Sequence, residues 1–160
     1  MSLQPTHTTG NTPAMPTRFA LYGHAPALSA TGTTFRMQEW QDSLTARELI
    51  EPRGGQVVIR YYDLEPEGRS RFHRDPWGQR PQARALLDAL TIPIFDAVII
   101  TKITTRTFGG SCLWNVAALL HHYGKQLWIG DLAGPLDPTA PAHVLLMKIL
   151  GGACPDGGGA

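Results

Sequence analysis

The sequence predicts an α/β domain in which a mostly parallel sheet is flanked by helices. Apolar, β-branched stretches alternate with helical stretches along the chain, the order that is typical of βαβ units. The 160 residues are enough for one domain with one hydrophobic core. The composition is globular, since 42% of the residues are hydrophobic and 17% are charged. We expect a central sheet of roughly four to five strands.

Short apolar runs predict the strands, and spacing together with proline and glycine stop signals predicts the helices. The predicted strands are residues 18–22, 56–62, 95–101 and 126–129, the first of them broken by Gly23 to Pro26. The predicted helices are residues 35–50, 80–90, 112–123 and 142–150. Residues 63–79 form a polar stretch that we expect to be a long surface loop. Trp40 and Trp128 are expected in the core.

The two ends of the chain have compositions that do not favour a packed structure. Residues 1–16 are rich in Thr, Pro, Gly and Gln, and we expect them to be a disordered tail. Residues 17–150 are the predicted domain, and residues 151–160 are expected to be a flexible, glycine-rich tail.

The charge of the chain limits the ways in which it could bind nucleic acid. The formal net charge is only +1 and the sequence pI is about 7.9. A domain that holds DNA alone usually carries a clear basic excess, because neutralising phosphates supplies much of the affinity. We therefore expect any contact with nucleic acid to be local or to be made by another chain.

The two cysteines and the lengths of the apolar segments indicate where in the cell the protein is expected. Cys112 and Cys154 lie far apart and show no metal-ligand spacing, so we expect them to be reduced thiols, and we expect neither a metal nor a cofactor. No apolar run approaches the roughly 20 residues of a membrane span, and residues 1–17 lack the apolar core of a signal peptide. We expect no membrane association and a cytoplasmic location.

Several local strings occur in an ordered series along the chain. The first is Tyr22-Gly23-His24-Ala25-Pro26-Ala27, and the others are residues 49–58, Tyr62-Asp63, residues 79–87, residues 95–100 and residues 122–128. Together they are similar to the catalytic domain of serine site-specific recombinases, the resolvase and invertase family, in a divergent form that resembles actinobacterial members. The resemblance covers residues 18–152 and implies a resolvase-like three-layer fold.

The resemblance also implies a DNA-cleaving site, of which this chain keeps only part. In the family a serine hydroxyl attacks a DNA phosphodiester to form a phosphoserine link, and arginines grip the phosphate. The nucleophile position falls on Pro26 and the arginine two residues earlier falls on His24, so the covalent step is expected to be lost. Arg80 and Arg106 match phosphate-contact arginines. The position of a further arginine falls on Gly109.

Two more departures concern the family's acidic residue and its dimer helix. The aspartate position falls on Thr105, and the glycines and proline after Leu150 cannot continue a long helix. The resemblance implies DNA recombination and integration, with DNA as a partner that this chain binds weakly alone. It also implies a homodimer or an active recombinase as the protein partner. The resulting hypothesis is an inactive recombinase-family protein, a pseudoenzyme.

Two readings from other classes stay open. Ser111 and Cys112 follow two glycines at the start of a predicted helix, where backbone N–H groups can hold an anion, so a small α/β hydrolase or anion-binding enzyme is one alternative. The string lacks the usual nucleophile and phosphate-loop patterns, which favours an ordinary helix cap. A non-enzymatic dimerisation module is the other alternative. Ser29, three residues past Pro26, is read as a solvated loop serine rather than a replacement nucleophile.

Overall fold

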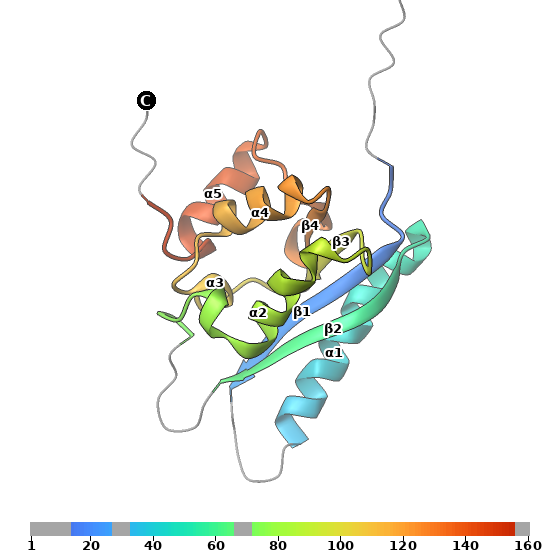
Figure 1. Cartoon of the computed structure of the whole chain (residues 1–160), viewed down its shortest axis with the longest axis horizontal. Helices are drawn as coiled ribbons and strands as arrows, with labels where there is room; N and C mark the ends of the chain where they lie inside the picture. The colour runs from blue at the N-terminus through green and yellow to red at the C-terminus, as the bar shows by residue number, and fades with distance from the viewer. Residues whose placement is uncertain (1–13, 27–32, 66–71, 156–160) are drawn as a thin grey trace, which may run out of the picture.

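The computed structural model describes residues 14–26, 33–65 and 72–155 (Figure 1). Its centre is a sheet with the strand order β2-β1-β3-β4-β5. The strands are β1 (Arg18–Pro26), β2 (Gln56–Glu65), β3 (Ala97–Ile100), β4 (Gln126–Ile129) and β5 (Gly134–Pro135). The first four run parallel and only β5 is antiparallel, so the predicted α/β class with a mostly parallel sheet is confirmed.

Helices cover both faces of the sheet, which gives three layers. They are α1 (Thr33–Ile50), α2 (Pro81–Asp88), α3 (Thr105–Phe108), α4 (Leu113–His122) and α5 (Pro141–Leu150), with short 3-10 turns between them. Successive side chains of β1 point to opposite faces of the sheet, and each set packs against the helices on its own side. Phe19 and Leu21 face α1, in one core cluster, whereas Ala20 and Tyr22 face the larger cluster that includes α2 and α4.

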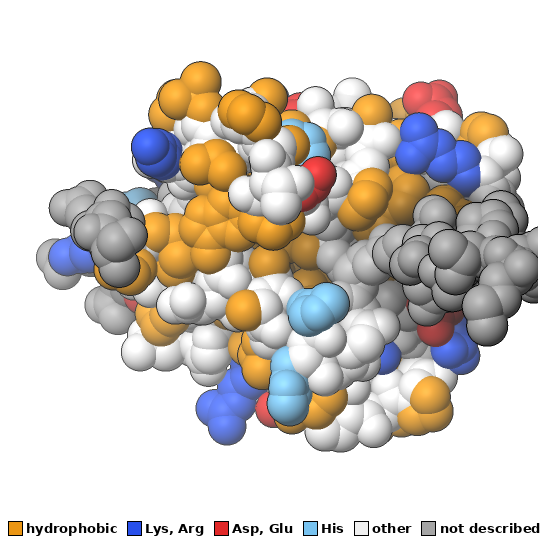
Figure 2. Space-filling view, turned by 90° about the horizontal axis from the view of Figure 1, so that it is seen from above, with side chains coloured by type: hydrophobic (Ala, Val, Ile, Leu, Met, Phe, Trp, Pro, Cys, Tyr) orange, Lys and Arg blue, Asp and Glu red, His pale blue; other side chains and the backbone are white. Residues whose placement is uncertain are grey.

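The side of the molecule that carries α4 and α5 shows apolar side chains at its surface (Figure 2). In that view most lysine and arginine side chains lie toward the rim. Leu145 and Ile149 of α5 are 62% and 66% exposed, and Leu119 and Tyr123 near the end of α4 are also exposed. None of the described helices is long and apolar enough to cross a membrane.

Strand β1 is longer than the sequence predicts. Gly23 to Pro26 does not break it, because each residue through Pro26 keeps a partner in β2, ending with Pro26 opposite Glu65. Proline lacks the N–H of a ladder donor, and it is tolerated here because β3 pairs only with Phe19 to Leu21, which leaves the end of β1 with β2 as its one paired strand. The carboxyl end of β1 is therefore fixed against β2 rather than released into a loop.

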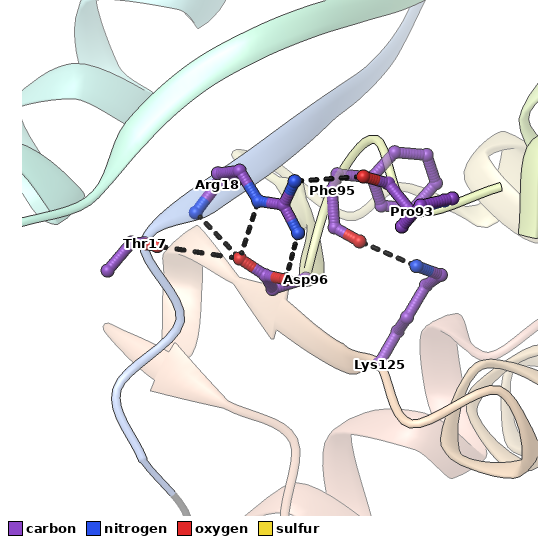
Figure 3. A network of polar contacts seen from close by, with 6 residues as sticks. All are labelled: Thr17, Arg18, Pro93, Phe95, Asp96 and Lys125. Carbon is purple, nitrogen blue, oxygen red and sulfur yellow. Dashed lines mark hydrogen bonds and ion pairs between the residues drawn. The ribbon is translucent and has the colours of Figure 1, made fainter.

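A polar network holds together the opposite, amino-terminal ends of β1 and β3 (Figure 3). The Arg18 guanidinium makes two hydrogen bonds to the Asp96 carboxylate, at 2.8 and 3.1 Å, and donates to the Pro93 carbonyl at 2.8 Å. Lys125 Nζ donates to the Phe95 carbonyl at 2.6 Å, and burial lowers the pKa of this lysine. The pKa of the Asp96 carboxyl is lowered, chiefly by the hydrogen bond from Arg18. These contacts join strands that are distant in the sequence, at the end away from the candidate site.

The segment from Phe72 to Arg80 is packed into the fold, contrary to its prediction as a surface loop. Phe72 and Trp77 are 3% and 1% exposed. The Trp77 ring stacks on Phe108 with ring centroids 5.2 Å apart, and its Nε1 donates to the Thr107 carbonyl at 2.9 Å. The prediction was wrong for this part because two aromatic anchors stand within an otherwise polar string. Residues 66–71 lie outside the described part of the chain.

The two cysteines form a disulfide, so the prediction of reduced thiols was wrong. Cys112, just before α4, is bonded to Cys154, 42 residues later, with their Cα atoms 4.4 Å apart. The segment that follows α5 folds back here. The Ala153 N–H donates to the Gly109 carbonyl at 2.9 Å, and the Leu113 N–H donates to the Gly151 carbonyl at 2.8 Å. Pairing over such a separation leaves no spacing signal in the sequence.

Trp128 is buried as expected, but Trp40 is 64% exposed on α1. The prediction of Trp40 in the core was wrong, because the buried side of α1 is made instead by Ala46 and Ile50.

Candidate functional site

A cavity of about 380 Å³ lies at the carboxyl ends of β1, β2 and β3. This is the edge of a parallel α/β sheet where ligands usually bind. Its lining consists of Tyr22, Gly23, His24, Pro26, Gln38, Asp42, Glu65, Ile100, Thr101, Lys102, Thr104, Thr105 and Arg106. Of the residues singled out from the sequence, the cavity brings together His24, Pro26, Thr105 and Arg106, whereas Arg80 is not in the lining.

His24 is held as a neutral imidazole on the cavity wall. Its Nε2 lies 3.3 Å from the Thr107 hydroxyl, and its Nδ1 is buried with no hydrogen-bond partner among the described residues. Burial, and then the nearby positive charge of Arg80, lower the pKa of His24 to about 4. At neutral pH the ring therefore carries no charge, and it supplies no cation to the cavity.

Arg80 is 1% exposed, and all five of its N–H groups are used inside the protein. Nε donates to the Asp75 carbonyl at 3.2 Å. Nη1 donates to the Tyr22 hydroxyl at 3.3 Å and to the Thr107 carbonyl at 2.8 Å. Nη2 donates to the carbonyls of Phe72 and Arg106, at 2.5 and 2.8 Å. A phosphate could reach this guanidinium only if some of these bonds were broken.

The Tyr22 hydroxyl links Arg80 to a buried carboxylate. It accepts from Arg80 and donates to Asp63 Oδ2 at 3.1 Å. Asp63, which is 2% exposed at the end of β2, also accepts from the backbone N–H groups of Gln82 and Ala83, at 2.8 and 2.9 Å. A carboxylate at this place satisfies the free donors at the start of α2 and favours the helix dipole. Burial, and then the Asp63 charge, raise the pKa of Tyr22 and keep it a phenol.

Arg106 is a different kind of residue from Arg80, because its side chain is half-exposed at the cavity. Its Nη1 lies 3.4 Å from Glu65 Oε2, and the Glu65 side chain is only 2% exposed. Arg106 stands on α3, whose start is capped by Thr104 and Thr107 in a reciprocal pair of side chain to backbone bonds. Lys102 and Arg106 supply the positive charge of the cavity lining, and Asp42 and Glu65 balance it.

The acidic part of the cavity was missed at the level of the sequence. Asp42, on α1, accepts hydrogen bonds from the hydroxyls of Tyr62 and Thr101 and from the Gln38 amide. Burial, and then the bond to Asp42, raise the pKa of Tyr62. Asp42 lies in the middle of a helix with no motif around it, and Glu65 falls in the polar stretch that the sequence predicts to be a loop.

Gly109 lies where the fold leaves no room for a side chain. Its φ is +49°, in a region that side chains rarely adopt. A Cβ at this position would lie 1.7 Å from the Phe72 carbonyl oxygen and 2.6 Å from Arg80 Nη2. The packed segment from Phe72 to Arg80 thus occupies the space that a side chain at position 109 would need.

The alternative site at Ser111 and Cys112 is not a free nucleophile site. Cys112 has no thiol because it is bonded to Cys154, and Ser111 Oγ accepts from the Trp77 N–H at 2.9 Å. The prediction of a helix cap is also refined, since Cys112 is the N-cap residue but its side chain makes no cap hydrogen bond. Ser29 lies outside the described residues. Within the described ranges, no group of three or more His, Cys, Asp or Glu residues is arranged to hold a metal ion.

Two solved structures are similar to this fold. The N-terminal catalytic domain of TP901-1 integrase matches with a TM-score of 0.56 and 16% identity, over 82% of this chain and 89% of that domain. A resolvase family site-specific recombinase from Streptococcus pneumoniae matches with a TM-score of 0.53 and 12% identity, over 82% of this chain and 83% of the other. No protein-family model matches the sequence. No curated protein matches it either.

The chain has the fold of serine recombinase catalytic domains, as its sequence strings predict.

Proposed function

We propose that this chain is a recombinase-fold subunit that contacts DNA without cleaving it and that acts together with a second recombinase-fold chain. The observation that carries the proposal is Pro26 on the cavity wall, at the carboxyl end of β1. Proline has no hydroxyl, so the phosphoserine link that the resemblance implies has no nucleophile at this position.

The other groups around Pro26 support a site without strand cleavage. His24 is neutral at pH 7, and all the donors of Arg80 are engaged inside the protein. Stabilising a phosphoryl transition state needs cationic donors that point at the reacting group. Of the two arginines proposed as phosphate contacts, Arg106 is the one that lines the cavity, and there it forms an ion pair with Glu65.

Binding of DNA at this edge is proposed to be weak and electrostatic. Lys102 and Arg106 are the cations of the cavity lining, and the two carboxylates nearby offset them. Such binding should weaken strongly as the salt concentration rises.

The test uses labelled duplex DNA from the regions that flank the chain's own gene. Fluorescence anisotropy measures reversible binding, and a denaturing gel of the same mixture measures covalent attachment. We expect salt-sensitive binding that weakens in Arg106→Ala and Lys102→Ala but not in the exposed control Arg84→Ala, with no adduct that survives denaturation. A surviving adduct that disappears in Ser29→Ala would overturn the proposal, because it would reveal a replacement nucleophile.

The second subunit is proposed to pair with the exposed apolar side of α5. Leu145 and Ile149 lie one helical turn apart and are both more than 60% exposed. Burying two such side chains would give part of an interface core. Another copy of the chain is the simplest partner. Light scattering after size exclusion should give about twice the 17.4 kDa chain mass, and about the chain mass for the double variant Leu145→Lys/Ile149→Lys. A wild-type protein that stays at the chain mass would refute pairing with itself.

A further inference from the structure

A second depression lies on the outer side of α1, next to the edge strand β2. Strand β2 is at the end of the sheet order, and α1 lies along it (Figure 1). The depression has a volume of about 190 Å³ and is lined by Arg36, Glu39, Trp40, Ser43, Leu44, Arg47 and Arg60. The α1 residues are spaced by one helical turn or less, so they form one stripe, and Arg60 faces them from β2. None of these residues lines the cavity at Pro26.

Positive charge is concentrated at this depression although the whole chain carries only +1. Three arginines face it and Glu39 is the one acidic residue in its lining. Arg36 and Arg60 form no hydrogen bond or ion pair with any residue that the structure describes. Arg47 is paired with Glu51 at 2.8 Å, but both side chains are at least half exposed, and such a pair contributes little stability. An anion could therefore use these guanidinium groups at small cost.

Ser43 is a second, independent sign of a missing ligand. It is 7% exposed and belongs to the lining, and its buried hydroxyl has no hydrogen-bond partner among the described residues. A buried hydroxyl without a partner costs roughly 1–3 kcal/mol, so native proteins rarely retain one without a reason. A ligand oxygen at the floor of the depression, reached when the surrounding side chains move, would be an acceptor for this hydroxyl.

Trp40 supplies an exposed aromatic face beside the charges. A tryptophan that is 64% exposed on a helix otherwise packed on a sheet is unusual. Apart from Glu39, the polar side chains of the lining are donors, and a phosphate offers acceptors only. A depression of 190 Å³ is smaller than most sites for whole drug-sized ligands, but it has room for a phosphate while an attached base lies outside against Trp40.

We propose that this depression binds a nucleotide unit, with the phosphate held by Arg36, Arg60 and Ser43 and the base stacked on Trp40. Bases inside a duplex are stacked on one another and cannot lie flat on a protein ring. The ligand is therefore an unpaired nucleotide, carried by a single strand or free in solution. The site is separate from the DNA contact proposed at Pro26.

The experiment titrates the full chain with a short oligothymidylate, its duplex with oligoadenylate, thymidine monophosphate and inorganic phosphate. Trp40 is the exposed tryptophan, Trp77 and Trp128 are buried, and Trp114 on α4 is partly buried. The part of the fluorescence quenching that is lost in Trp40→Leu therefore reports stacking on Trp40. We expect quenching by the single strand and little by the duplex. Trp40→Leu and Arg60→Ala should each weaken binding about tenfold or more, as for removal of one stacking platform or phosphate contact.

Ser43→Ala separates a binding role from a structural one. If the hydroxyl serves the ligand, the variant should bind the single strand several-fold more weakly while its stability to urea is equal or higher, because the unpaired buried group is gone. Unchanged binding in Ser43→Ala would contradict the assignment of Ser43. Tyr123→Leu, just after α4, and Arg84→Ala on α2 are exposed controls of matched type and should leave binding unchanged.

Comparing the ligands of the titration shows whether the bound nucleotide belongs to a single strand or is free in solution. Tighter binding of the oligonucleotide than of the monophosphate assigns the site to a strand, and equal binding assigns it to a free nucleotide. Equal binding of duplex and single strand, or binding that survives in both Trp40→Leu and Arg60→Ala, would overturn the proposal. Loss of self-association in Trp40→Leu without any nucleotide binding would also overturn it and would assign this face to a protein partner. Arg106→Ala and Lys102→Ala should not affect this site, which separates its failure from that of the DNA contact at Pro26.

Discussion

Replacement of Arg80 by lysine tests whether this buried arginine holds the fold around the candidate site. The guanidinium reaches four backbone carbonyls and one hydroxyl, which come from different parts of the chain. Lysine keeps the positive charge but has only three donors on a single nitrogen. At least two of the five acceptors would therefore lose their partner. Arg80 also lies over the Phe72 ring, with 4.4 Å between Cζ and the ring centroid, and a lysine would lose that planar contact.

The size of the effect follows from the number of bonds lost. An unpaired buried polar group costs roughly 1–3 kcal/mol. Two such groups give about 2–6 kcal/mol, a large part of the 5–15 kcal/mol of unfolding free energy that is typical of native proteins. We therefore expect Arg80→Lys to lower the unfolding free energy by about 2–6 kcal/mol.

Urea unfolding followed by circular dichroism measures this change. The matched control is Arg84→Lys, one turn further along α2, where the arginine is 69% exposed and makes one ion pair at 4.0 Å to Asp88. The control should stay within about 0.5 kcal/mol of the wild type. If Arg80→Lys were equally harmless, the account of Arg80 as a structural anchor would be refuted. An Arg80 free to grip phosphate would then be the better description.

Three further predictions concern other parts of the same framework. His24 binds a proton near pH 6.5 when unfolded but only near pH 4 when folded, so wild-type stability should fall by up to about 3 kcal/mol from pH 6.5 to pH 4. His24→Gln should show a smaller fall in urea unfolding, and an identical pH dependence would contradict the buried, neutral imidazole. Gly109→Ala should lose more than about 2 kcal/mol, whereas Gly54→Ala, also at positive φ but with open space around it, should lose about 1 kcal/mol. Similar losses would argue against the tight packing at Gly109. Replacing Cys112 and Cys154 with serine should lower the unfolding free energy by about 4 kcal/mol, because the unfolded chain gains the entropy of an open loop. A reductant should destabilise the wild type but not this variant. Free thiols in the unfolded, unreduced protein would disprove the disulfide.

The sequence carries enough information for the sheet and its helices because their signals are local. The run Ala97–Ile100 is apolar throughout and is fully buried between two parallel neighbours. Pro81 stands at the first position of α2, as its fixed φ predicts. The end of β1 could not be predicted in the same way. Gly23 and Pro26 are local breakers, and pairing with β2 overrides them.

The candidate site depends on contacts that a sequence does not display. The position of Arg80 at the start of a helix is visible, but four of its acceptors are backbone carbonyls, which have no residue signature. The disulfide could not be predicted for a related reason. The chain turns back at Gly151 and Gly152 and pairs with the backbone around Cys112, and this long-range contact has no local sequence signal. Trp40 was placed in the core because large apolar residues usually are, and only the structure shows that it lies outside.

The proposal of a recombinase fold that does not cleave DNA is tested most directly by the mass of the protein itself. The chain is incubated with duplex DNA from the flanks of its own gene, separated under denaturing conditions and measured by intact-mass spectrometry. We expect the protein to keep its mass of 17.4 kDa, in the wild type and in Ser29→Ala alike. A species heavier by the mass of a DNA strand, joined through a phosphate to a protein hydroxyl, would contradict it.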